Sequence, residues 1–146
     1  MISMGEQDRG EGHGSDAAAA RSAFDLLGGE ARVRELVDRF YDLMALESRF
    51  ASLRALHPQD LEGSRDKLHA FLCGWLGGPP LYEMRFGHPR LRARHLPYPI
   101  GSRERDDWLL CMAQAMHDID VPEPLLDRLL HAFHGTADWM RNRPDR

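Results

Sequence analysis

Two helix-breaking prolines close to a histidine constrain this chain more than any other feature. Residues 87–101 read GHPRLRARHLPYPIG, and His95 stands two residues before Pro97. Proline lacks a backbone N–H and disfavours helical geometry in the residue before it, so a helical turn carrying His95 is expected to end almost at once. An imidazole at a helix end can offer one nitrogen to a metal ion while the other donates to a carbonyl one turn earlier. His95 is therefore a candidate metal ligand.

Apolar residues recur at helical spacing along three long segments. The first begins at Glu30, with its apolar face formed by Val33, Leu36, Val37, Phe40, Tyr41 and Met44. The second follows Ser102, the expected N-cap, with Trp108, Leu109, Met112, Ala115, Met116 and Ile119 on one face. The third follows Pro122 and Pro124, with Leu125, Leu126, Leu129, Leu130, Phe133, Ala137 and Met140.

Shorter segments fill the gaps between these helices. We expect short helices over residues 22–27 and 79–86, and a short helix or turn over 47–56 that ends at His57-Pro58. A further helix opens at Asp60 or Leu61, carries Leu61, Leu68, Phe71, Leu72 and Trp75 on one face, and ends at Gly77-Gly78-Pro79. His69 is expected at the surface of this helix. No segment alternates like a strand, so the fold class is all-α, a bundle of about five main helices.

Composition limits the architecture and the classes of partner. A chain of 146 residues with 42% hydrophobic content supports one core. A net charge of −4 argues against a nucleic-acid-binding surface, which needs clustered basic residues. Cys73 and Cys111 fall on apolar helix faces, as expected of reduced core thiols in a cytoplasmic protein.

The N-terminal residues differ in composition from the rest. Residues 1–21 are rich in Gly, Asp, Glu and Ser and lack the continuous apolar run of a signal peptide or membrane span. We interpret them as a disordered extension preceding a domain over residues 22–142, with residues 143–146 as a short tail.

Several separated motifs resemble one family. The stretch around His95 is followed by ERDDWLLCM and preceded by FYDLM (40–44) and WLGGPPLY (75–82). In this order and spacing they resemble the group II truncated haemoglobins, small globins of bacteria and plants. The resemblance implies a 2-on-2 helical sandwich around a haem b (iron protoporphyrin IX), with His95 as the proximal iron ligand. His88 is the rival ligand, but the family uses the later histidine of the stretch.

The same resemblance assigns residues to the opposite, distal side of the haem. It implies that the Tyr41 hydroxyl, the Trp108 indole N–H and a ring N–H of His57 point toward bound ligand. From the residues alone, Tyr41 would be a core tyrosine and His57 an exposed loop residue. The other expected haem-pocket residues are Ser64, Lys67, Leu68, Phe71, Tyr82, Leu91, Arg94 and Met112.

Some of these pocket residues have specific expected roles. Ser64 stands where ordinary globins carry a distal histidine, and its small side chain shifts ligand hydrogen bonding to other groups. Lys67, Arg92 and Arg94 are candidates to pair with the haem propionates, and solvated side chains are the alternative for each.

The implied function is reversible, high-affinity binding of O₂ and other diatomic ligands such as CO and NO. Several donors around the ligand slow its release, which disfavours oxygen transport and favours peroxidase or NO-detoxifying chemistry. Electrons for such an enzyme would come from a separate reductase, and neither nucleic acid nor membrane is an expected partner. The alternatives are a haem-free helical interaction module, in which His95 and Trp108 are core residues, and a haem-based gas sensor. The sequence leaves transport, sensing and catalysis open.

Overall fold

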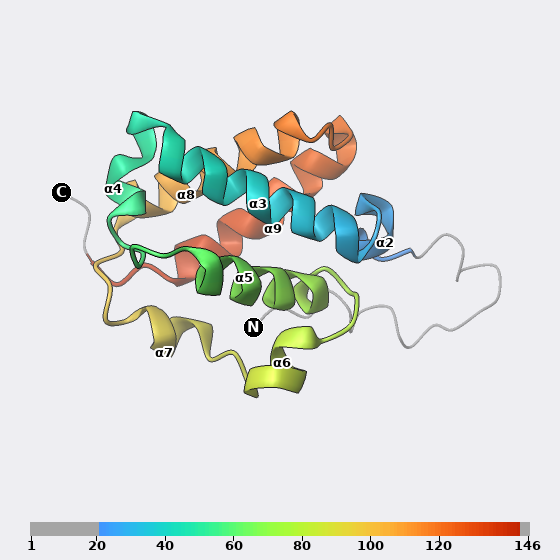
Figure 1. Cartoon of the computed structure of the whole chain (residues 1–146), viewed down its shortest axis with the longest axis horizontal. Helices are drawn as coiled ribbons and strands as arrows, with labels where there is room; N and C mark the ends of the chain where they lie inside the picture. Colours follow the sequence, from blue (N-terminus) through green and yellow to red (C-terminus); the bar gives the residue numbers. More distant parts are fainter. Residues whose placement is uncertain (1–20, 144–146) are drawn as a thin grey trace.

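All regular structure in the computed structural model, which describes residues 21–143, is helical (Figure 1). The all-α prediction is confirmed. Apart from Arg21 and Arg143, the predicted extension and tail lie outside the described residues. The elements are α2 (Ala23–Leu27), α3 (Glu30–Leu46), the 3-10 turn η2 (Ser48–Phe50), α4 (Ala51–Arg54), α5 (Glu62–Trp75), α6 (Leu81–Phe86), α7 (Leu91–His95), α8 (Ser102–Asp118) and α9 (Glu123–Trp139).

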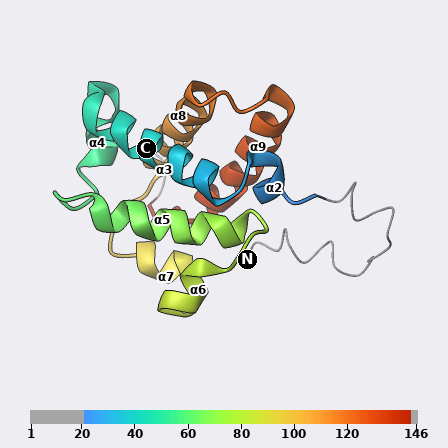
Figure 2. The same cartoon turned by 45° about the vertical axis from the view of Figure 1, so that its right-hand side comes forward.

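The four longest helices pack as two pairs. Helix α3 lies against α5, α8 lies against α9, and the pairs meet where α3 packs on α8 (Figures 1 and 2). The short helices α6 and α7 lie on the side of α5 that faces away from α3 (Figure 2). This arrangement is the 2-on-2 sandwich that the family resemblance implies. No helix among residues 21–143 is long and apolar enough to span a lipid bilayer.

The apolar stripe of α3 forms the centre of the core. All six predicted positions on it are buried, with none more than 5% exposed. On α8 the stripe is buried at Met112, Ala115, Met116 and Ile119, whereas Trp108 and Leu109 are only partly buried. Cys73 and Cys111 are both buried and unbridged, as predicted.

Aromatic rings connect the helix pairs. The ring of Phe133 on α9 stacks on Trp75 of α5, with centroids 4.7 Å apart, and makes an edge contact with Trp108 of α8 at 5.5 Å. Trp108 in turn contacts Phe40 of α3 at 5.3 Å. Large rigid rings in contact stabilise the core and fix one another's orientation. The Trp108 ring is therefore held on two sides.

Two helix starts differ from the prediction. Helix α8 begins at Ser102 itself, and the Glu104 carboxylate accepts the N–H of the preceding Gly101 at 2.7 Å. Helix α5 begins at Glu62, where the Asp60 carboxylate accepts the Glu62 N–H at 3.0 Å. In both cases an acidic side chain satisfies an N–H that the helix leaves without a partner.

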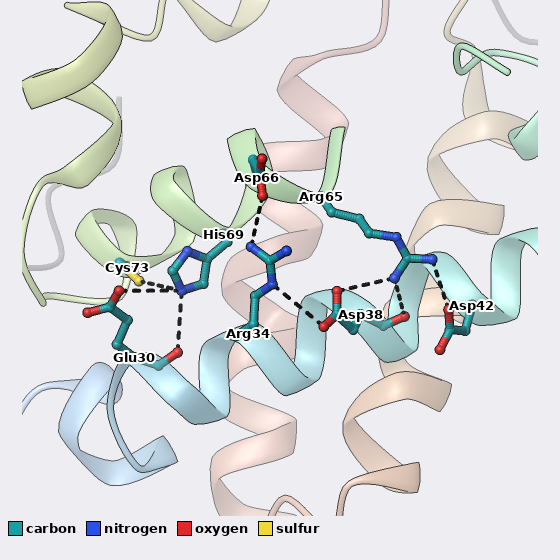
Figure 3. A network of polar contacts seen from close by, with 8 residues as sticks. All are labelled: Glu30, Arg34, Asp38, Asp42, Arg65, Asp66, His69 and Cys73. Atoms are coloured by element: carbon teal, nitrogen blue, oxygen red, sulfur yellow. Dashed lines mark hydrogen bonds and ion pairs between the residues drawn. The ribbon is translucent and has the colours of Figure 1, made fainter. Parts of the chain in front are cut away.

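His69 also differs from the prediction of a surface position. Its side chain is only 12% exposed and lies between α5 and α3, as Figure 3 shows. Nε2 of His69 is 3.3 Å from the Glu30 carbonyl oxygen and 3.6 Å from the Cys73 Sγ. Helical periodicity places a residue on a face of its own helix, but it does not show how closely another helix covers that face.

The chain after α9 returns to the segment between α7 and α8. The N–H groups of Asn142 and Arg143 both donate to the Ile100 carbonyl, at 2.7 and 3.1 Å. The Asn142 side chain accepts the Ile100 N–H at 3.0 Å and donates to the carbonyls of His95 and Tyr98 at 3.3 and 3.0 Å. This segment therefore fixes the backbone around His95.

Two glycines with opposite surroundings test the packing. A Cβ on Gly78 would lie 2.6 Å from the Phe24 ring, whereas a Cβ on Gly135, within α9, would meet nothing within 4 Å. We expect Gly78→Ala to lower the free energy of unfolding by about 1–3 kcal/mol through overpacking. Gly135→Ala should raise it by about 0.5–1 kcal/mol, because alanine favours the helix. Urea unfolding followed by circular dichroism measures both, and equal stabilities would contradict the packing at Gly78.

Candidate functional site

His95 ends the single-turn helix α7, as its distance from Pro97 predicts. Its Nδ1 is 2.7 Å from the Leu91 carbonyl oxygen, one turn earlier. A carbonyl oxygen only accepts, so Nδ1 carries the proton and Nε2 of the neutral ring keeps its lone pair. The ring is thus oriented and has a nitrogen available for a metal ion.

His57 repeats this arrangement at the corner after α4. Its Nδ1 is 3.0 Å from the Leu53 carbonyl oxygen, so Nδ1 carries the proton here too. Burial lowers the pKa of His57 most, and the charge of Arg54 lowers it further, against the bond to Leu53, which raises it. The ring is therefore neutral near pH 7.

The tautomer of His57 changes one sequence-based expectation. We expected a ring N–H of His57 to point toward a bound ligand. The Nδ1–H is instead directed to Leu53, and Nε2 of the neutral ring can only accept a hydrogen bond or bind a metal ion. Only a protonated His57 would donate from both nitrogens.

Tyr41 lies on the inward face of α3, beside His57. Its ring makes edge contacts with Phe40 at 5.0 Å and with His57 at 5.7 Å. Burial raises the pKa of Tyr41, an effect that the positive charge of Arg65 partly offsets and Cys111 adds to. The phenol is therefore protonated at neutral pH. Its hydroxyl makes no hydrogen bond with any residue in the range 21–143, so it is available as a donor.

Trp108 is the third residue predicted on the distal side. Phe40 contacts both Tyr41 and Trp108, so the three predicted distal residues join in one group through that ring. The Trp108 indole N–H has no hydrogen-bond partner within the described part of the chain. Two donors, the phenol and the indole, and one acceptor, the imidazole of His57, thus belong to a single cluster.

The predicted pocket residues of α5 form a partly buried surface. Ser64, Leu68 and Phe71 are each partly buried, and the Phe71 ring meets Tyr82 of α6 edge-on at 6.4 Å. The Lys67 ammonium lies 5.8 Å from the ring centre of Phe86, a residue that the sequence did not single out. Leu91 is partly buried and holds His95 through its carbonyl, and Met112 is fully buried in the core.

Arginines around α7 bind backbone carbonyls. Arg94 Nε donates to the Pro89 carbonyl at 2.8 Å, which closes the start of the turn. Arg92 donates to the carbonyls of Trp139 and Arg141 at 3.1 and 3.2 Å and so ties α7 to the end of α9. Arg92 was a candidate partner for a propionate, and its Nε and Nη2 donate instead to backbone carbonyls at and just after the end of α9.

His88 has a different environment from His95. It is exposed, and its Nδ1 accepts the N–H of Arg90 at 3.0 Å. The ring thereby stabilises the turn that leads into α7. Asn142, which holds the His95 carbonyl, is a residue that sequence reasoning missed, because it lies beyond the last periodic stripe.

Comparison with known proteins shows the family of this chain. The family model of bacterial-like globins matches residues 22–142. The group 2 truncated haemoglobin YjbI of Bacillus subtilis is 39% identical over 117 residues, which is 80% of this chain and 86% of that protein. The chain belongs to the group II truncated haemoglobins. The predicted family is thereby confirmed.

Solved structures of this family share the fold. The group II 2-on-2 haemoglobin of Agrobacterium tumefaciens is 42% identical, with a TM-score of 0.81 over 86% of this chain and 96% of that one. The truncated oxygen-avid haemoglobin of Bacillus subtilis is 37% identical, with a TM-score of 0.76 over 84% of this chain and all of the other.

Membership of the globin family implies that the protein binds haem and, through it, diatomic gases. The residues fit that group. His95 offers an Nε2 lone pair, and the partly buried apolar side chains of Leu68, Phe71 and Trp108 suit the flat hydrophobic face of a porphyrin. The alternative of a haem-free interaction module is therefore set aside.

The pH dependence of stability tests the environment of His57. Because its pKa is lowered in the folded state, the unfolded chain binds a proton below about pH 6.5 that the folded protein does not bind. Stability contributed by the neutral ring is thus lost as the pH falls through that value. We expect urea unfolding to show a steeper loss of stability below about pH 6.5 for the native protein than for His57→Gln. Parallel pH profiles would contradict the assignment.

Proposed function

We propose that this globin binds haem b through Nε2 of His95 and holds O₂ with high affinity on the side of Tyr41 and Trp108. Haem, when bound, supplies an iron that takes a diatomic ligand at its open position. The observation that carries the proposal is the pair of unpartnered donors, the Tyr41 hydroxyl and the Trp108 N–H, joined through Phe40.

On the proximal side, the chain fixes the orientation of the His95 imidazole. The Leu91 carbonyl accepts the Nδ1–H of His95, which sets the ring orientation and makes Nε2 a stronger donor of its lone pair. The Asn142 side chain holds the carbonyl of His95 itself. Lys67 and Arg94 are proposed as partners of the haem propionates, because both are exposed cations, Lys67 on the helix that carries Leu68 and Phe71 and Arg94 next to His95.

On the distal side, the chain supplies hydrogen-bond donors. Oxygen held by a haem protein carries partial negative charge, and each donor bond in a dry pocket contributes about 1–3 kcal/mol. We assign these bonds to Tyr41 and Trp108. Neutral His57 packs its ring edge-on against Tyr41 and leaves the Tyr41 O–H available for the ligand, while the small Ser64 leaves room for ligand.

Strong retention of oxygen favours redox chemistry over oxygen transport. Donors aimed at a bound oxygen species also polarise an O–O bond, which suits peroxide reduction or oxidation of NO. Residues 22–142 match the globin family, which supplies no flavin or nicotinamide site of its own, and we propose a separate reductase as the source of electrons for turnover. The relative from Bacillus subtilis is described as oxygen-avid, which agrees with this direction. The two buried free thiols are consistent with a reducing, cytoplasmic compartment.

Substitution of the two histidines tests the iron ligand. His95→Ala should abolish the native five-coordinate ferrous spectrum, because no other imidazole in the described chain ends α7. His88→Ala should leave it intact, because that ring serves a turn. Visible spectra of the reduced proteins provide the measurement. Native ligation in His95→Ala would refute the assignment.

Oxygen release tests the distal donors. If the indole contributes about 1.5 kcal/mol, Trp108→Phe should speed O₂ dissociation about tenfold, and Tyr41→Phe should act in the same direction. Carbon monoxide carries less charge on its outer oxygen, so its release should change less. Stopped-flow measurements at normal haem content give both rates. Unchanged O₂ release in both variants would refute the proposal of a donor-rich pocket.

A further inference from the structure

A ladder of ion pairs joins α3 to α5 along one side of the molecule (Figure 3). Arg34 of α3 pairs with Asp66 of α5 at 3.0 Å and with Asp38 of its own helix at 3.5 Å. Arg65 of α5 reaches the opposite way and pairs with Asp38 at 3.2 Å and Asp42 at 2.8 Å. Two arginines, one from each helix, therefore bind the same interface through similar partners.

Arg65 differs from Arg34 in what else it touches. Its guanidinium carbon lies 5.8 Å from the ring centre of Tyr41, within the range of a cation–π interaction. The Arg65 side chain is 16% exposed, against 37% for Arg34, so solvent screens its charge less. For Arg34 no ring contact is found within residues 21–143. Arg65 thus contacts the proposed distal tyrosine, whereas Arg34 does not.

The carboxylates hold the Arg65 charge in this place. Its NH1 donates to both the side chain and the backbone carbonyl of Asp38, and its NH2 donates to Asp42. Asp42 follows Tyr41 directly in the chain, so the guanidinium is bound to the same turn of α3 that carries the phenol. Burial lowers the pKa of Arg65, and the bonds to Asp42 and Asp38 more than offset that effect. The group is therefore charged.

We infer that Arg65 is a positioning residue that sets the orientation and hydrogen-bonding strength of the Tyr41 hydroxyl. A fixed positive charge beside the ring withdraws electron density from the phenol and makes its O–H a stronger donor. In agreement, Arg65 acts to lower the pKa of Tyr41 against the burial that raises it. The inference rests on the distal role proposed above for Tyr41, and it assigns part of the oxygen affinity to a side chain outside the group formed by Tyr41, His57 and Trp108.

The ladder offers its own matched control. Arg65→Gln and Arg34→Gln each remove an ion pair to Asp38 and a pair to one further aspartate, and each breaks at least one link between α3 and α5, but only the first removes a charge from beside Tyr41. We expect Arg65→Gln to speed O₂ dissociation from the haem-loaded protein roughly two- to fivefold, the factor that a partly exposed cation–π contact implies. Arg34→Gln should leave the rate unchanged. Arg65→Lys should restore part of the effect, because it keeps the charge but not the two-carboxylate fork.

Two further measurements distinguish an effect of Arg65 on the Tyr41 hydroxyl from a general loosening of the interface between α3 and α5. The stretching frequency of bound CO should shift in Arg65→Gln toward its value in Tyr41→Phe. In the haem-free protein with isotope-labelled tyrosine, the NMR signal of the Tyr41 phenol carbon should move in Arg65→Gln and stay in Arg34→Gln. In a Tyr41→Phe background, Arg65→Gln should have no further effect on O₂ release, since the group it acts through is gone.

The outcomes distinguish this inference from the proposed function. If Tyr41→Phe speeds oxygen release but Arg65→Gln and Arg34→Gln behave alike, the inference is overturned and the distal role of Tyr41 stands. An effect of Arg65→Gln that persists in the Tyr41→Phe background also overturns it. If Tyr41→Phe has no effect on oxygen release, the proposed role of Tyr41 fails, and the role of Arg65 in oxygen affinity fails with it.

Discussion

The hydrogen bond between His95 Nδ1 and the Leu91 carbonyl is the interaction on which the candidate site depends. It decides which ring nitrogen keeps a lone pair and where that nitrogen points. A helix of one turn, such as α7, is not stable in isolation, because the conformational entropy lost in forming a first turn exceeds the stabilisation from its few hydrogen bonds. The turn therefore relies on contacts from elsewhere, namely the bonds of Arg92 to the end of α9 and of Asn142 to the His95 backbone.

The distal side is positioned by core packing of long helices rather than by polar bonds to a short turn. Tyr41 and Trp108 come from long helices, and their positions follow from packing against Phe40 and Phe133 in the core. Packing in a dense core fixes the orientation of these rings, in contrast to a ligand turn that polar bonds fix at the surface. The protein thus combines distal aromatic residues fixed by core packing with a proximal turn that depends on a few hydrogen bonds.

The sequence predicted those features that local periodicity or a proline determines. The stripe of α3 is buried at every expected position, and α7 ends at His95 as Pro97 requires. Features that depend on residues far apart in the chain were not predictable in this way. The residues adjacent in sequence do not indicate that Asn142 binds the His95 carbonyl, that Arg65 lies beside Tyr41, or that α3 covers His69. The proton position on His57 likewise depends on the local fold around Leu53.

The bonds from Asn142 also bear on the order in which the protein folds. Asn142 and His95 are separated by 47 residues, as are Arg92 and Trp139, so α7 cannot be fixed until α8 and α9 have docked. Contacts that close long loops form late, because their entropy cost is met only after local structure exists. The aromatic core depends on the same docking step, because Phe133 of α9 stacks on Trp75 and contacts Trp108. Docking of α9 therefore completes the apolar interior and fixes the proximal turn together, so a newly made chain gains its iron ligand geometry only when its last helix is in place.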